Sequence, residues 1–413
     1  MSELRDVDIV RVGAQGDGVA AGDGPPLFVP FSLPGERVRA LIDGGRIRLQ
    51  DVLKASPSRI APVCQHFGVC GGCSLQHMAT DSYAEWKREQ VIAAFRARGL
   101  DVPVRDLVRP SGLRRRAVFT VRNSAGSIEI GFNEAGTHDL VALVECPVLD
   151  PRIVAAIPGL RTLIAPLLPK SDDVRVSVTM TCAGLDISLD GVRRTLSPDV
   201  RTRIARDAAD MKLARVSVGD EPVYESLPPF LRFGAVEVVL PPKIFIQAVA
   251  EAEQEMANQI VAALGKAKSV VDLFAGIGAF SFPIASRAKV SAYDSDARAI
   301  AALAAAVKKA SGIKPVVARV RDLFREPLSA LELNDFDAVV FDPPRAGAEA
   351  QARMIAKSKV KAVVAVSCNP ATLARDARIL VDGGYTLEDV MPIDQFLYSA
   401  HIEAVAVFRR LKR

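Results

Sequence analysis

The chain has 413 residues, 49% of them hydrophobic and 24% charged, and carries a formal net charge of +5 with a pI near 8.9. This composition excludes an intrinsically disordered protein and supplies enough apolar side chains for two or three packed domains. The charge is too moderate to indicate a polyanionic partner by itself. Charges of both signs alternate over the first six residues and no apolar run approaches roughly 18 residues, so we expect a cytoplasmic protein.

Residues 1–55 show short apolar segments separated by glycine and proline. The clearest are residues 28–31 and 38–42, and a glycine-rich turn lies between residues 13 and 18. Strand-length apolar segments punctuated by turn residues are typical of small antiparallel barrels. We therefore predict a β-barrel for this region.

The middle region, residues 56–240, begins with a cysteine cluster. Cys64, Cys70 and Cys73 lie among prolines and glycines, with five and then two residues between them, whereas the other three cysteines are scattered. In a reducing compartment such a cluster indicates a metal site rather than disulfides. The site is therefore a candidate functional feature of this region.

One helix and several strands are predicted after the cysteine cluster. Residues 81–98 have the periodicity of an amphipathic helix, and residues 116–121, 127–132 and 174–178 are strand-like. Together they predict a central α+β domain.

From residue 241 to residue 413, apolar strands alternate with alanine-rich helices such as residues 297–310. This alternation is the pattern of a doubly wound parallel sheet. We therefore predict the α/β class, with a Rossmann-like C-terminal domain.

Cys368 lies where an apolar run gives way to a helical segment. The run is Val363–Val366, and Asn369-Pro370 follows the cysteine. Helix N-termini favour anions and lower the pKa of a cysteine, so we expect a reactive thiolate here. The alternative is an inert buried cysteine, the commoner fate of a lone cysteine.

Earlier strand ends carry glycines and acids. The glycines of residues 272–278 would let the backbone pass close to a ligand, although their spacing is not the full dinucleotide fingerprint. Asp294 follows the next predicted strand and suits ribose hydroxyls, and Asp322 follows the third and suits an adenine amino group. Each acid could instead cap a helix. Together they favour S-adenosylmethionine as the cofactor.

Residues 272–278, 342–347 and 367–370 resemble the motifs of the bacterial RNA 5-methyluridine methyltransferase family, and the resemblance covers nearly the whole chain. It implies a class I methyltransferase domain over residues 241–413 and a TRAM-like oligonucleotide-binding barrel over residues 1–55. The cysteine spacing resembles the branch that methylates 23S ribosomal RNA and carries a [4Fe–4S] cluster. The transfer RNA branch lacks this cluster.

The resemblance also implies a mechanism. Cys368 would add to C6 of a uridine, because uracil C5 is too weak a nucleophile to take the methyl group directly. Glu403 matches the general base that removes the C5 proton after methyl transfer, and Asp342 would position the donor and the base. His401 would flank Glu403 or simply pack in a loop.

Residues 241–247 resemble a pocket-lining segment of the family, so Gln247 is expected to bind S-adenosylmethionine. The other cofactor-binding residues that the resemblance implies are Phe274, Gly276, Asp294, Asp322 and Asp342. At Ala279 relatives often have a polar residue, and loss of its hydrogen bond would weaken cofactor binding by about 1 kcal/mol.

An all-cysteine iron–sulfur site needs a fourth thiolate. Cys146, followed by proline as in the family, is expected to complete the site, whereas Cys182 is expected in the core of a strand. Zinc is the alternative, since four-cysteine zinc sites are common. We expect a structural role for the cluster, remote from the Cys368 pocket.

For RNA binding, Arg114-Arg115-Arg116 offers positive charge beside Phe119. Attack at C6 needs access to the uracil ring, so the target base is expected to be flipped out or single-stranded. We expect a monomer that acts on 23S rRNA, with a transfer RNA uridine or another ribosomal uridine as alternatives. A non-catalytic iron–sulfur RNA-binding protein is the alternative of a different class, and it would be expected to lack Cys368, Glu403 or the donor loop.

Overall fold

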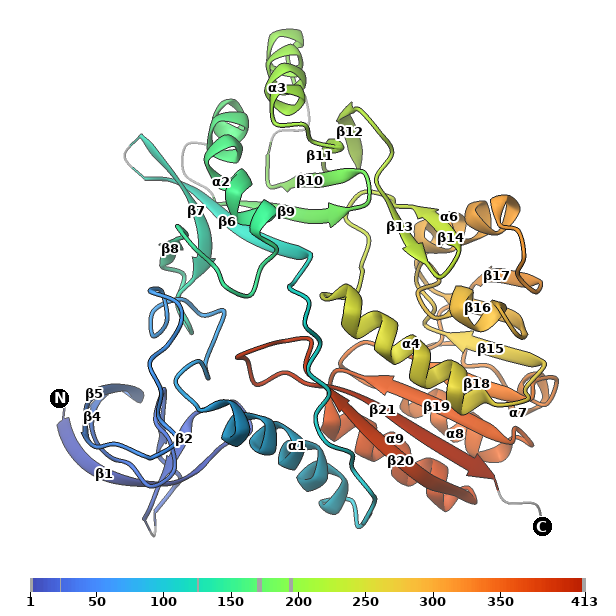
Figure 1. Ribbon diagram of the computed structural model, residues 1–413, viewed down its shortest axis with the longest axis horizontal. Coiled ribbons are helices and arrows are strands. Elements are labelled where there is room, and N and C mark those ends of the chain that lie inside the picture. Colours follow the sequence, from blue (N-terminus) through green and yellow to red (C-terminus); the bar gives the residue numbers. More distant parts are fainter. Residues whose placement is uncertain (1–2, 23, 125, 169–172, 193–195, 411–413) are drawn as a thin grey trace.

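The computed structural model describes residues 3–22, 24–124, 126–168, 173–192 and 196–410. Its strands form three larger sheets, which follow one another along the chain, and a two-stranded hairpin (Figure 1). None of the helices in the described ranges has the length and apolarity to cross a bilayer.

The N-terminal sheet is antiparallel, in the order β3-β2-β1-β4-β5. Its two ends, β3 and β5, contact each other, so the sheet curls into a half-closed barrel around a small apolar core. This confirms the β-structure predicted for the region. The strands are β1 (Glu3–Val12), β2 (Gly18–Ala20), β3 (Phe28–Val29), β4 (Arg37–Asp43) and β5 (Arg46–Lys54).

The central sheet has the order β12-β11-β10-β9-β6-β7-β8. Alternate residues of β6, including Phe119 and Val121, are buried under α2 and α3 in one core. The strands are β6 (Arg116–Ser124), β7 (Ser127–Asn133), β8 (Leu140–Ala142), β9 (Val174–Thr181), β10 (Gly184–Asp190), β11 (Arg215–Val218) and β12 (Glu221–Glu225). The helices are α2 (Pro151–Ile164), the 3-10 helix η1 (Ala165–Leu167) and α3 (Pro198–Asp210).

The C-terminal sheet has the order β17-β16-β15-β18-β19-β21-β20. The first five of these strands pair in parallel and β21 is antiparallel to both neighbours, which confirms the predicted Rossmann-like domain. The strands are β15 (Ser269–Leu273), β16 (Lys289–Asp294), β17 (Val316–Val320), β18 (Ala338–Phe341), β19 (Ala362–Ser367), β20 (Tyr385–Ile393) and β21 (Glu403–Arg410).

Helices cover both faces of this sheet, over two separate apolar cores (Figure 1). One core includes residues of α4 to α6 and the other includes residues of α8 and α9. The helices are α4 (Ala250–Leu264), α5 (Ser281–Ala285), α6 (Ala297–Lys309), α7 (Ala330–Leu333), α8 (Glu349–Lys357) and α9 (Pro370–Asp382).

Two elements from the stretch assigned to the central domain pack against the C-terminal domain. Helix α1 (Thr80–Arg96) contacts α9, and its Val91 and Phe95 are fully buried in the same core as α9. The hairpin β13 (Phe230–Phe233) and β14 (Val236–Val239) contacts α6 and shares the core of the opposite face. Two segments that precede residue 241 therefore pack directly against the C-terminal domain.

Candidate active site

Three residues from separate strand ends meet at one edge of the C-terminal sheet. Asp342 follows β18 and Cys368 follows β19, and the carboxyl ends of these parallel neighbours lie side by side. Strand β21 runs the other way and pairs Ala404 with Ser367, so Glu403 at its start lies beside the end of β19. Ligands bind at this edge in open α/β sheets. The topology thus brings together all three predicted catalytic residues.

A chain of hydrogen bonds joins the two carboxylates through two glutamines. Gln247 Nε2 donates to Asp342 Oδ2 at 2.9 Å. Gln395 Nε2 donates to both Gln247 Oε1 at 2.8 Å and Glu403 Oε1 at 2.7 Å. The backbone N–H of Ala248 donates to Gln395 Oε1 at 3.0 Å, which fixes the orientation of that amide.

Gln395 is 1% exposed and was not predicted from the sequence. The only available signal was an amide side chain in the segment just before the strand that begins at Glu403. Nothing in the sequence shows that this segment folds back onto Gln247. The contact exists only in the folded chain.

At this edge of the sheet, the buried oxygens Glu403 Oε2 and Asp272 Oδ1 have no hydrogen-bond partner among the described residues. Burial raises the pKa of Glu403 to about 7. The pKa of Asp342 lies well above its usual value, because of burial first and then the nearby charges of Glu403 and Asp272. At neutral pH this cluster can therefore exchange protons, as a general base requires.

The environment of Cys368 differs from the expectation. Its pKa is raised to about 11, because burial and the carboxylates of Glu403 and Asp342 outweigh the favourable charge of Arg345. The helix N-terminus does not compensate, since Asn369 caps α9 and accepts from the Ala371 N–H at 3.1 Å. The pKa of Cys368 therefore lies above its ordinary value, not below it as expected, and Cys368 is a thiol at neutral pH.

His401 is exposed, and its Nδ1 lies 3.4 Å from Arg345 Nη2. Its ring packs edge-on against Phe396, with 5.9 Å between centroids. Partial desolvation of the ring by its neighbours and the charge of Arg345 lower its pKa, so the ring is neutral at pH 7. The loop-packing alternative describes this residue well.

The loops predicted to bind S-adenosylmethionine lie at the same edge of the sheet. Phe274 and Gly276 both have positive φ, at 62° and 54°, in the turn after β15. The Gly276 N–H donates to Asp294 Oδ2 at 2.8 Å, and the Phe324 N–H donates to Asp322 Oδ1 at 3.0 Å. Both acids order local backbone, but neither is the N-cap of a helix, so the capping alternative does not describe them.

Aromatic rings flank these loops. The rings of Phe274 and Phe324 lie 5.4 Å apart at 56°, and Phe324 is 49% exposed. An exposed aromatic face beside two acids suits a nucleoside, which combines a flat ring with hydroxyl and amino donors. Ala279 is partly buried against the core and adds no polar group.

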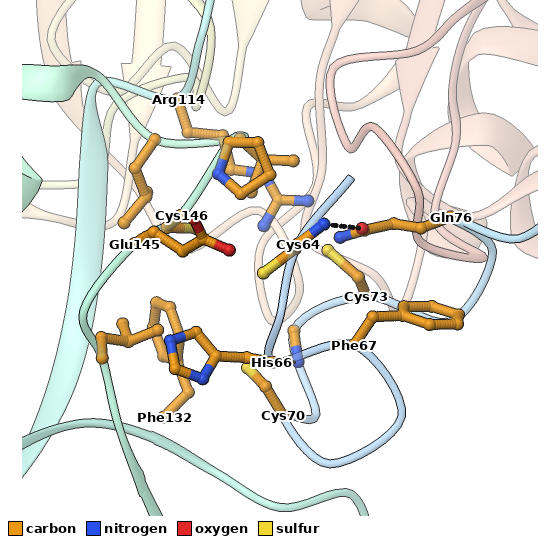
Figure 2. Close-up of a pocket in the computed structure, with 15 residues that line it drawn as sticks. Cys64, His66, Phe67, Cys70, Cys73, Gln76, Arg114, Phe132, Glu145 and Cys146 are labelled. Carbon is orange, nitrogen blue, oxygen red and sulfur yellow. Dashed lines mark hydrogen bonds between the residues drawn. The ribbon is translucent and has the colours of Figure 1, made fainter. Parts of the chain in front are cut away.

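The four predicted metal ligands line one cavity of about 80 Å³ (Figure 2). Cys64, Cys70 and Cys73 come from the loop before α1, and Cys146 comes from the segment before α2. Burial raises the pKa of Cys146 to about 11, with a contribution from two of the other thiols. Arg114 also lines the cavity and supplies a positive charge.

The cysteine loop is joined to the central domain by hydrogen bonds to the other wall of the cavity. The Gln65 N–H donates to Glu145 Oε1 at 2.7 Å, and the Val144 N–H donates to His66 Nε2 at 3.2 Å. Within the described ranges, no group of three or more His, Cys, Asp or Glu side chains is arranged to hold a metal ion.

Three expectations for single side chains need correction. Cys182 is exposed, because β9 ends at Thr181 and the cysteine falls in the turn to β10. Phe119 is fully buried in the central core and cannot stack on RNA. Arg115 is 11% exposed and pairs with Glu253 at 2.7 Å, so it is not free for phosphate.

Comparisons with known proteins show which families and proteins the chain resembles. The sequence model of the family described as tRNA (Uracil-5-)-methyltransferase matches residues 236–411. An uncharacterized RNA methyltransferase of Brucella suis is 47% identical over 99% of both chains. The 23S rRNA (uracil(1939)-C(5))-methyltransferase RlmD of Halomonas elongata is 33% identical over 97% of this chain and 88% of its own.

A solved structure has the same fold. The tRNA (uracil-54, C5)-methyltransferase of Pyrococcus abyssi, in complex with S-adenosyl-L-homocysteine, superposes with a TM-score of 0.75 over 98% of this chain and 99% of its own, at 22% identity. The RlmD relative is more than 30% identical and is matched over nearly the whole chain. The chain therefore belongs to the RNA (uracil-5-)-methyltransferase family.

Proposed function

We propose that this S-adenosylmethionine-dependent RNA methyltransferase methylates C5 of a uridine in 23S ribosomal RNA, through a covalent bond between Cys368 and C6. The observation that carries the proposal is the meeting of Cys368, Glu403 and Asp342 at one edge of the sheet, with a buried Glu403 oxygen that has no partner among the described residues. A nucleophile and a base in one pocket are what addition and elimination at a pyrimidine require.

The methyl donor would lie along the ends of β15 to β18. Asp294 would accept from the ribose hydroxyls and Asp322 from the adenine amino group, with Phe274 and Gly276 forming the turn beneath them. Gln247 and Asp342 would line the end nearest to Cys368. When bound, S-adenosylmethionine supplies an electrophilic methyl group.

Cys368 Sγ would form a bond to C6 of the uridine, with the electron pair moving onto the O4 enolate. The thiol gives its proton to solvent water before attack, and Arg345 is the positive group that favours the resulting thiolate. C5 then takes the methyl group, and Glu403 accepts the C5 proton. The electrons of the C5–H bond restore the C5–C6 double bond as the S–C6 bond breaks.

Two features favour ribosomal RNA over transfer RNA as the substrate. The RlmD relative, which matches 97% of this chain at 33% identity, is named for 23S rRNA. The four-cysteine cavity is the second, because the resemblance links this pattern to the ribosomal branch. A ribosomal substrate would place the protein in the cytoplasm.

The cysteine cavity would hold a [4Fe–4S] cluster. The donors fit such a group: four thiols surround one enclosed space, and Arg114 offsets the negative charge of a thiolate-ligated cluster. Zinc is the alternative, since four-cysteine zinc sites are common. The resemblance to the iron–sulfur branch favours the cluster.

Transfer of labelled methyl groups tests the proposed function. Wild-type protein is expected to label 23S rRNA from cells that lack the gene. It is not expected to label transfer RNA, or rRNA that wild-type cells have already methylated. Cys368→Ala is expected to bind the same RNA and transfer no methyl group. Labelling of transfer RNA alone, or turnover by Cys368→Ala, would overturn the substrate or the mechanism respectively.

A further inference from the structure

The loop between β20 and β21, residues 394–402, carries Gln395 and leads into Glu403. It is held by helix α1, from the other half of the chain. Lys87 Nζ donates to Asp394 Oδ1 at 2.6 Å and to the His401 carbonyl at 2.5 Å. One buried ammonium thus binds both the first residue of the loop and one of its last.

Tyr83, one turn before Lys87 on the same helix, adds two hydrogen bonds. Its hydroxyl donates to Asp394 Oδ2 at 2.7 Å and accepts from the Tyr398 N–H at 2.9 Å. Tyr83 is 2% exposed, and the Lys87 side chain is fully buried. Buried charges are expensive to leave unpaired, so Lys87 and Asp394 favour a single arrangement of the loop.

Tyr398 has a φ of 62°, a left-handed conformation that a bulky residue rarely adopts. Its carbonyl accepts two backbone hydrogen bonds, from Ser74 at 2.8 Å and from Leu75 at 3.0 Å. Strained backbone persists where surrounding contacts over-determine it, and it clusters at functional sites. Here the contacts come from α1 and from the segment that follows Cys73.

The cysteine cavity touches the same loop at a second point. Arg114, which lines the cavity, lies over the ring of Phe396 at 5.7 Å and donates to the Leu397 carbonyl at 3.4 Å. Arg114 therefore connects the wall of the cysteine cavity to this loop.

We propose that Tyr83 and Lys87 are positioning residues for methyl transfer, which act with the Ser74–Leu75 backbone to hold the 394–402 loop so that Gln395 orients Glu403. Filling of the cysteine cavity fixes Ser74 and Leu75 and so orders the same loop. This inference rests on the proposed function, because it assigns to Glu403 the role of the base.

The test compares Tyr83→Phe with Tyr385→Phe. Tyr385 is the matched control, because it is 3% exposed and its hydroxyl donates to the Val360 carbonyl, away from the loop. Tyr83→Phe is expected to lower kcat about five- to tenfold with KM for RNA unchanged, whereas Tyr385→Phe keeps the wild-type kcat. In Tyr83→Phe, Glu403 becomes more hydrated and its pKa falls. The acid limb of the pH profile of this variant is therefore expected to move to lower pH.

Hydrogen–deuterium exchange supplies a readout independent of turnover. Residues 395–402 are expected to exchange faster in Tyr83→Phe than in Tyr385→Phe, and faster in wild-type protein stripped of its metal than in loaded protein. If Tyr83→Phe does not fold, the paired replacement Lys87→Met/Asp394→Leu, which leaves no buried charge unpaired, carries the same expectations.

The outcomes separate this inference from the proposed function. If the wild type methylates RNA but Tyr83→Phe matches Tyr385→Phe in kcat and exchange, the positioning role is wrong and the proposed function stands. If the wild type labels no uridine, the proposed function fails. Equal exchange of the loop in loaded and stripped protein would overturn the link to the cysteine cavity.

Discussion

Burial sets the proton affinities in the catalytic pocket. Glu403 is 3% exposed and has a pKa of about 7, compared with 4.5 for an ordinary glutamate. A base must be ionised to accept the C5 proton. Turnover is therefore expected to rise with pH and to reach half of its maximum near pH 7. A rate independent of pH between 5 and about 8 would contradict this assignment.

The same shift has a consequence for stability. Because the folded state binds the Glu403 proton more tightly than the unfolded state, the stabilising effect is complete below about pH 4.5 and is lost as the pH rises through 7. Glu403→Gln removes this dependence. It is expected to raise the melting temperature by a few degrees at pH 8 and to change it little at pH 4, as calorimetry at both values would show.

Removal of the base separates the steps of the reaction. Glu403→Gln keeps Cys368 and the donor loops but cannot accept the C5 proton, so turnover is expected to fall by about 10²- to 10⁴-fold. The methylated RNA should then remain bound to Cys368 and migrate with the protein on a denaturing gel. The Cys368→Ala/Glu403→Gln double variant is the control, and an adduct in that protein would exclude Cys368 as the nucleophile.

Helix α9 connects the position of Cys368 to the neighbouring catalytic loop. Its N-cap residue, Asn369, accepts from the Ala371 N–H and also donates from Nδ2 to the Arg345 carbonyl at 3.1 Å. The cap therefore does more than end a helix, because it ties the loop after β19 to the loop after β18. Both loops carry proposed catalytic residues.

Asn369→Ala is expected to lower the free energy of unfolding by about 1 kcal/mol and kcat by about tenfold, because Cys368 loses its fixed neighbour. Ser197→Ala is the matched control. Ser197 caps α3 in the central domain, where it accepts from the Val200 N–H. The control should lose similar stability by urea titration and keep its turnover, and an equal loss of turnover in both would refute a local effect at the site.

On the scale of the whole molecule, the cysteine cavity joins two segments that are about seventy residues apart in the chain (Figure 2). A group that binds all four thiols would bind the folded chain and not the unfolded chain, and so would stabilise the fold. Cys146→Ser is expected to lose bound iron and visible absorption, and to lower the melting temperature by about 5 °C. Cys182→Ser, at an exposed position, should change neither. A colourless wild type with stoichiometric zinc would overturn the iron–sulfur assignment.

Much of the fold was predictable because its signals are local. Helix α1 (Thr80–Arg96) lies within two residues of the predicted segment, and α6 (Ala297–Lys309) ends one residue before the predicted end. The strand ends at Asp342 and Cys368 were also predicted, since apolar runs of strand length end there. Partners remote in sequence escaped prediction, as in the packing of α1 on α9, and so did the exact strand end that places Cys182 in a turn.

The sequence by itself determined the elements, the residue types of the site and the family resemblance, because periodicity and motif spacing are properties of neighbouring residues. Tertiary structure alone decided that Gln395 bridges Gln247 and Glu403, that Cys368 is a thiol, and that α1 holds the loop before Glu403. Burial and hydrogen bonding between distant segments determine these properties, and neither is fixed until the chain has folded.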